Sequence, residues 1–95
     1  SPEKTWQMYV AALKKKDINE AVNCFSPSSQ DKYRQIFTAL EDKLDEMATE
    51  MKVIGKIVES GGRAKYRIRR VEKGEEITYY IHFINIFGEW KIKQF

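Results

Sequence analysis

Basic residues occupy every second position of the segment RAKYRIRR, which begins at Arg63. Because the side chains of a strand alternate between its two faces, a strand here directs these cations to one face of a sheet. Cations beside aromatic rings suit single-stranded nucleic acid, and a cationic surface also suits anionic lipid headgroups. A net charge of +3 is small for a nucleic-acid-binding domain, so we do not expect nucleic acid as the partner. The predicted anionic-partner face consists of Arg63, Lys65, Arg67, Arg69, Lys91 and Lys93.

The other reactive residues form no catalytic or metal-binding pattern. The chain has one histidine, His82, and one cysteine, Cys24, and their distance in the sequence matches no metal-ligand spacing. Cys24 lies among apolar residues of a predicted helix, which favours an inert buried thiol over a nucleophile. The pair Gly61-Gly62 lies between strands and opens no helix, so it does not predict a phosphate-binding loop. We therefore expect neither an enzymatic activity nor a cofactor.

Aromatic residues from several segments offer a second kind of site. Such rings can line a cavity for a small apolar ligand, with tyrosine hydroxyl groups that orient it. The same rings can instead fill the core, and for a chain of 95 residues the filled core is our main expectation. The pocket candidates are Tyr9, Tyr33, Phe37, Tyr66, Tyr79 and Trp90.

Three helices are predicted in the first half of the chain, over residues 3–15, 17–24 and 28–49. Apolar residues recur at helical spacing in each of them, beginning with Trp6 in the first. Asp17 and Glu20 form a variant of the capping box at the start of the second helix. Pro27 suits the first position of the third helix, which is the longest. After about Glu50 the apolar period changes from 3.6 to 2.

Four strands are predicted in the second half, over residues 51–59, 63–72, 76–86 and 89–95. Short glycine-containing turns separate consecutive strands, which indicates an antiparallel meander. Strands that follow a group of helices indicate an α+β fold, with three N-terminal helices packed on a curved four-stranded sheet. A last turn at Phe87-Gly88 pairs Phe83 with Ile92 and so determines which residues share a face.

The strand over residues 76–86 is apolar on both of its faces. The inner face, under the helices, is predicted to collect Val53, Ile57, Ala64, Tyr66, Ile68, Ile77, Tyr79, Ile81, Phe83, Trp90 and Ile92. The three helices cannot also cover the outer face, and exposed apolar patches mark interaction sites. A symmetric homodimer needs one self-complementary patch of this kind. The predicted interface residues are Tyr80, His82, Ile84 and Phe95.

Charge is distributed unevenly along the chain. Residues 1–50 contain seven Lys or Arg and nine Asp or Glu, whereas residues 51–95 contain ten and five. The halves therefore carry −2 and +5, and the basic character belongs to the predicted sheet. The length fits a single domain over residues 1–95, and no segment reaches the ~18 apolar residues of a membrane span. Membrane association would then require a lipid anchor outside these residues.

Three phrases of the sequence resemble the nuclear transport factor 2-like superfamily, which has a cystatin-like fold. They are TWQMYVAALKKKDINEAVNCFS, KYRQIFTAL and YYIHFINIFGEWKIKQF, the last with a G-x-W-K-I pattern from Gly88 to Ile92. The resemblance implies a cone of helices against a curved antiparallel sheet and pairing through the sheets. It is closest to small uncharacterised domains of bacterial envelope lipoproteins, which implies the cell envelope, with the cytoplasm as the alternative. Enzymes of this superfamily place Asp, Tyr or His inside the cone, whereas here His82 falls on the outer face.

These observations lead to one main expectation and two alternatives for function. The main one is a non-enzymatic binding or assembly module that dimerises or docks a partner through the outer sheet face. The first alternative is a small apolar ligand binder, or a vestigial enzyme, that uses the interior of the cone. The second alternative is a binder of anionic surfaces, either nucleic acid or lipid headgroups.

Overall fold

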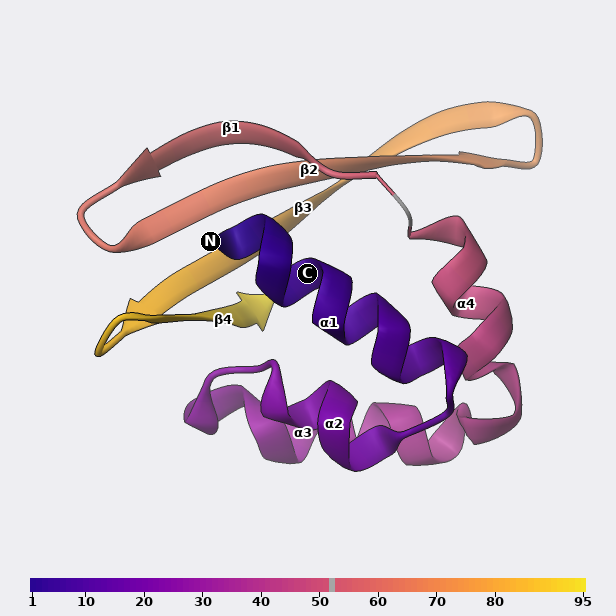
Figure 1. The fold of residues 1–95 in the computed structure, drawn as a ribbon. Helices are drawn as coiled ribbons and strands as arrows, with labels where there is room; N and C mark the ends of the chain where they lie inside the picture. The colour runs from indigo at the N-terminus through magenta and orange to yellow at the C-terminus, as the bar shows by residue number, and fades with distance from the viewer. Residues whose placement is uncertain (52) are drawn as a thin grey trace.

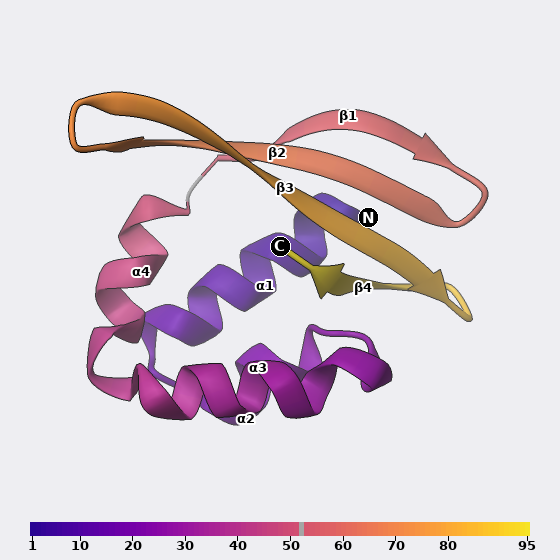
Figure 2. The ribbon, with the colours of Figure 1, turned by 180° about the vertical axis from the view of Figure 1, so that it is seen from behind.

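Four α-helices cover one face of a four-stranded sheet in the computed structural model, which describes residues 1–51 and 53–95 (Figures 1 and 2). The helices are α1 (Pro2–Lys14), α2 (Ile18–Asn23), α3 (Pro27–Ala39) and α4 (Leu44–Glu50), with a 3₁₀ helix, η1 (Glu41–Lys43), before α4. The strands are β1 (Gly55–Ser60), β2 (Arg63–Glu72), β3 (Glu75–Ile86) and β4 (Glu89–Gln94). The predicted α+β class, with helices first and strands second, is confirmed.

The first three helices begin at Pro2, Ile18 and Pro27, each one residue from the predicted start, and local signals stand at each beginning. The Ser1 hydroxyl accepts a hydrogen bond from the Lys4 backbone N–H at 3.3 Å, which caps α1. The Asp17 carboxylate accepts one from the Glu20 backbone N–H at 3.0 Å, which caps α2. Pro27 is the first residue of α3.

The single helix predicted over residues 28–49 is wrong, because the chain turns at Leu40 and continues as η1 and α4. Leu40 leaves the helical region with φ −106° and ψ 17°, although no glycine or proline is nearby. The turn brings Leu44 and Ala48, both fully buried, against α1. It also lets the Trp6 indole N–H donate to the Met51 carbonyl at 2.9 Å. Tertiary packing therefore overrides the local helical pattern.

The sheet is the predicted antiparallel meander, in the order β1-β2-β3-β4. The predicted register of the last hairpin is confirmed, with Phe83 opposite Ile92. The free side of β4 is partly covered by the segment between α2 and α3. There Ile92 donates to the Cys24 carbonyl and accepts from the Ser26 N–H, both at 2.8 Å.

Phe95 lies on the inner side of the sheet and not on the outer face as predicted. The pairing of β4 with β3 shifts between Ile92 and Gln94, so that Lys93 is an extra residue. One extra residue in a strand reverses which face the following side chains occupy. The Phe95 ring therefore packs against Trp6, with 5.4 Å between ring centroids, and stacks on Tyr33 at 5.7 Å.

Val53 and Ile57, expected in the core, are 79% and 44% exposed. The pairing of β1 with β2 shifts between Lys56 and Val58, so Ile57 is the extra residue of a second bulge. Ile57 belongs to β1, which is the edge strand of the sheet.

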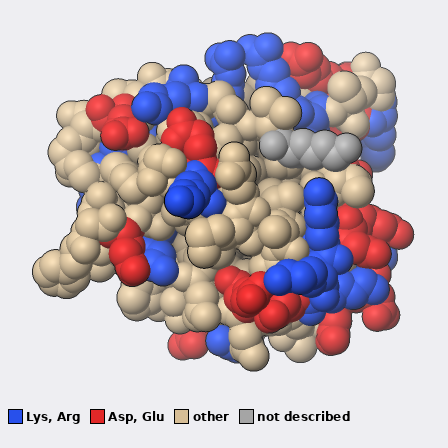
Figure 3. Space-filling view, in the orientation of Figure 1, with Lys and Arg blue, Asp and Glu red and all other residues tan. Residues whose placement is uncertain are grey.

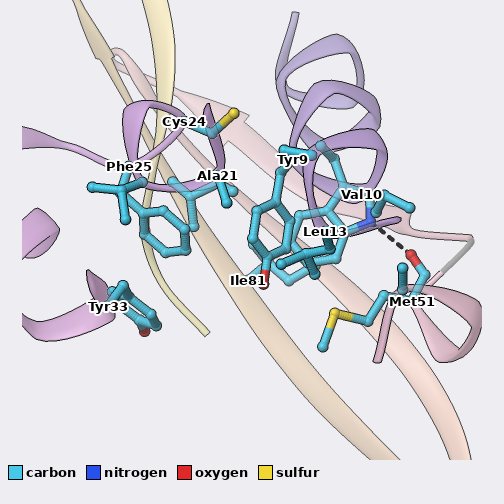
Figure 4. Close-up of a cluster of buried hydrophobic side chains, with 14 of the residues drawn as sticks. Tyr9, Val10, Leu13, Ala21, Cys24, Phe25, Tyr33, Met51 and Ile81 are labelled. Atoms are coloured by element: carbon cyan, nitrogen blue, oxygen red, sulfur yellow. Dashed lines mark hydrogen bonds between the residues drawn. The ribbon is translucent and has the colours of Figure 1, made fainter. Parts of the chain in front are cut away.

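Aromatic side chains dominate the core between helices and sheet. Tyr9 from α1 packs its ring at 5.5 Å from that of Phe25 and at 5.9 Å from that of Phe37. Figure 4 shows Tyr9 beside Leu13 and Ile81, with the hydrogen bond to Met51 at one end of the cluster. On the sheet, the fully or almost fully buried residues are Ala64, Tyr66, Ile68, Ile81, Phe83 and Ile92.

Candidate functional site

The six pocket candidates do not share one environment. Tyr9, Tyr33, Phe37 and Tyr66 are at most 5% exposed. The ring of Phe37 lies at 5.9 Å from that of Tyr9 and at 6.0 Å from that of Tyr33, so these three rings fill space between the elements. Tyr79 is 36% exposed at the far part of β3, where its hydroxyl donates to the Glu72 carboxylate at 3.0 Å. Trp90 packs against the edge of the core and lines a groove on the surface.

Reactive side chains are held in unreactive settings. Cys24 is buried, its thiol donates to the Glu20 carbonyl at 3.5 Å, and burial raises its pKa. The buried hydroxyl of Tyr9 has no hydrogen-bond partner among the described residues, and burial raises its pKa far above the ordinary value. Within residues 1–51 and 53–95, no group of three His, Cys, Asp or Glu is placed to hold a metal ion. In the same ranges, no helix is long and apolar enough to cross a membrane.

The outer sheet face brings the predicted cations together with His82 and Tyr80. Cross-strand pairing places Lys65 beside His82, and His82 beside Gln94. Tyr80 is 48% exposed, and the Lys65 ammonium lies 4.4 Å from the centre of its ring. The neighbouring rows are Arg63, Ile84 and Lys91, then Arg67 with Tyr80, then Arg69 with Thr78.

A shallow hollow of about 260 Å³ lies on this face. Besides parts of Ala64 and Phe83, it is lined by Val58, Ser60, Arg63, Lys65, His82, Lys93 and Gln94. The lining contains three cationic residues and no carboxylate. The sequence predicted its basic members, but Val58, Ser60 and Gln94 were not among the predicted site residues. Gln94 reaches this face through the bulge in β4, which has no clear sequence signal, whereas Val58 and Ser60 pair with Lys65 and Arg63 directly across the Gly61-Gly62 turn.

Some cations of this face have acidic neighbours and others do not. Arg69 lies 3.8 Å from the Glu76 carboxylate, and Lys91 lies 3.8 Å from that of Glu89. For the remaining four, the described residues place no carboxylate within the 4.0 Å of an ion pair; these four are Arg63, Lys65, Arg67 and Lys93. Figure 3 shows Lys and Arg side chains along the upper margin of the molecule, over the sheet. We refer to Arg63, Lys65, Arg67 and Lys93 as the unpaired cations.

Comparison with known proteins identifies no relative: no family model, curated protein or solved structure matches the chain. Its function must therefore be argued from the geometry of its own residues.

Proposed function

We propose that the protein is a non-enzymatic binding module whose outer sheet face docks an acidic segment of a protein partner. The observation that carries this proposal is the group of unpaired cations, three of which line a hollow whose lining contains no carboxylate. Uncompensated like charges on one sheet face lower stability, and an acidic partner would offset that cost. The absence of a cofactor or a catalytic group is part of the same proposal.

The chemistry of the face favours a protein segment over other anions. Single-stranded nucleic acid needs aromatic rings on which bases stack, but among the described residues the one exposed aromatic ring on this face, Tyr80, already has Lys65 over it. Insertion into a lipid surface needs a cluster of projecting apolar side chains, whereas Ile84 and Ile86 are half-buried in the sheet. Two apolar residues on the described part of this face are exposed, but they form no cluster, because Val58 pairs with Lys65 near one end of β2 and Val71 lies near the other end. A second copy docked face to face would bring the unpaired cations of both copies together, which like-charge repulsion opposes.

The edge of the sheet next to the hollow suits an extended segment. In the described residues β1 pairs with β2 alone, so one side of β1 has free backbone groups. Val58 of β1 is 52% exposed and lines the hollow. An acidic peptide can therefore lie beside β1 as an added strand, with its carboxylates near the unpaired cations.

Membership of the nuclear transport factor 2-like superfamily stays a proposal as well. It has the support of the three sequence phrases and of a helical layer on one face of a curved antiparallel meander (Figures 1 and 2). The envelope lipoprotein likeness and the bacterial location that it implies rest on the sequence phrases alone.

Titration calorimetry with a peptide of ten glutamates tests the docking proposal. We expect binding that weakens as salt rises, and that weakens about tenfold when Lys65→Gln and Arg67→Gln are combined. The matched control combines Lys14→Gln with Lys43→Gln. This pair also removes two positive charges, but from exposed lysines on the helices.

Three results would overturn the docking proposal. They are no binding of the peptide at low salt, equal loss in the two double variants, and tighter binding of an oligothymidine or of anionic vesicles than of the peptide. The first result would show that the face does not bind acidic peptides. The second would show that binding depends on net charge and not on this face, and the third would assign the face to nucleic acid or to lipid.

A further inference from the structure

The turn between β3 and β4 presents a bulky ring in an unfavourable backbone conformation. Phe87 is fully exposed, at 102% of its reference area, and has φ +51°. Gly88 follows with φ +88°, so both central residues of this two-residue turn are left-handed. Asn, Asp and Gly are the usual residues at such positions, because a bulky side chain in the left-handed conformation crowds its own backbone. Phe87 is therefore unfavourable in two ways: its backbone conformation is strained and its apolar ring is exposed to water. The turn itself does not need a phenylalanine at this position.

Hydrogen bonds hold this turn in place. The Asn85 side-chain oxygen accepts from the Gly88 backbone N–H at 2.8 Å. The Asn85 N–H donates to the carbonyl of Gly62 at 2.8 Å, which ties the turn to the neighbouring β1–β2 turn. The Phe87 ring is thus displayed from a fixed position at the end of the sheet.

A groove of about 580 Å³ begins beside the same turn. One wall is the exposed side of α1, with Thr5, Met8 and Ala11, and the opposite wall includes Trp90 of β4. Met8 is 61% exposed, so an apolar side chain faces the groove without cover. A cavity of roughly 150 Å³ already holds a benzene ring, so the groove has room for a phenylalanine side chain.

We propose that the groove binds Phe87 of a second copy of this chain, in a two-fold symmetric dimer. A two-fold interface requires that one surface carry both the projecting group and the site that receives it. Phe87 is adjacent to Gly88 and Glu89 of the groove lining, yet its full exposure shows that it does not fill the groove of its own chain. The projecting Phe87 ring and the groove therefore lie side by side, and within one chain the ring does not occupy the groove.

The charges that line the groove are also suited to self-association. Lys4 lies in α1 and Lys15 is the C-cap of that helix, Glu20 lies in α2, and Glu89 and Lys91 lie in β4. Figure 3 shows Lys and acidic side chains close together on the side of the molecule that carries α1. A surface with both signs can meet its own copy without net repulsion, unlike the outer sheet face. Apart from Lys91, which borders both surfaces, the groove lining contains none of the unpaired cations and no residue of the hollow, so a dimer would present two docking faces.

Sedimentation velocity from micromolar to near-millimolar concentration, with two variants, tests the dimer. Phe87→Asn introduces a residue that favours the left-handed turn and removes the ring, so we expect the dimer dissociation constant to rise at least about tenfold. The melting temperature of the monomer should rise in the same variant. Ala11→Arg, which fills the groove from an exposed position of α1, should also dissociate the dimer, whereas Ala39→Arg on α3 should not.

Two outcomes contradict the proposal. A wild-type chain that stays monomeric over the whole range rules out the self-association. A dimer that persists in both Phe87→Asn and Ala11→Arg places the interface elsewhere on the molecule. Loss of the dimer in both variants, with the Ala39→Arg control intact, supports the contact and leaves binding of the glutamate peptide as a separate question.

Discussion

The hydroxyl group of Tyr9 is buried without a hydrogen-bond partner among the described residues, and this makes it a source of instability. Tyr9→Phe removes the hydroxyl while keeping the ring that packs between Phe25 and Phe37. We expect the free energy of unfolding to rise by about 1 kcal/mol in urea denaturation, because the desolvation penalty of the hydroxyl is lost. Tyr33→Phe is the matched control, since the Tyr33 hydroxyl accepts from the Phe95 N–H at 3.1 Å and its removal should destabilise.

The same residue predicts how stability changes in alkaline solution. Burial raises the pKa of Tyr9, so above about pH 10 the unfolded chain loses this proton while the folded chain keeps it. The free energy of unfolding should therefore fall as pH rises above 10, by at most about 1.4 kcal/mol per pH unit for this group. Denaturation curves at several pH values should show a shallower fall for Tyr9→Phe. An equal fall in both proteins would show that Tyr9 does not contribute.

Single residues also show what the sequence can and cannot reveal about the site. Alternation alone placed Arg63, Lys65 and Arg67 on one face, because side-chain direction in a regular strand follows from position. The alternation could not show which of these cations have no carboxylate nearby in the folded sheet. Arg69 acquires Glu76 as a neighbour only through the pairing of β2 with β3, which is a property of the folded sheet.

At the scale of elements, the bulge in β4 determines whether Phe95 is a core or a surface residue. In the structure Phe95 packs against Trp6, Tyr9, Phe25 and Tyr33. We expect Phe95→Ala to lower the free energy of unfolding by about 2–4 kcal/mol, as for a large core ring that is not fully enclosed. The control is Phe87→Ala, measured at a concentration at which the chain is monomeric; it removes an identical ring from a fully exposed position and should not destabilise the monomer. A Phe95→Ala cost below about 0.5 kcal/mol would instead match the outer-face position predicted from simple alternation.

Helices and strands could be predicted where local sequence signals set their ends. They could not be predicted where contacts between distant residues set them. Caps at Ser1 and Asp17 and the glycine turns between strands act within a few residues, so helix starts and the meander follow from the sequence. The turn at Leu40 and the two bulges have no such signals. The turn at Leu40 places Leu44 against α1, and the bulge in β4 places Phe95 in the aromatic core, so both depend on distant contacts.

For the molecule as a whole, the proposed docking function predicts that the unpaired cations lower the stability of the fold. Replacing both Arg63 and Arg67 by threonine removes two like charges and supplies a residue that favours strands. We expect the free energy of unfolding to rise by about 0.5–1 kcal/mol at low salt, and the gain to shrink as salt screens the repulsion. Binding of the glutamate peptide should weaken in the same variant. Denaturation at two salt concentrations and calorimetry measure the two effects on one preparation.

Arg69→Thr separates this trade-off from a general benefit of threonine in strands. Arg69 lies on the same strand and the same face, but Glu76 is 3.8 Å away, so its removal leaves an acidic residue without its partner. This variant should gain no stability at low salt. If Arg63→Thr with Arg67→Thr lowers stability and leaves peptide binding unchanged, the cations support the sheet itself. The basic face would then have to be explained by the fold and not by a partner.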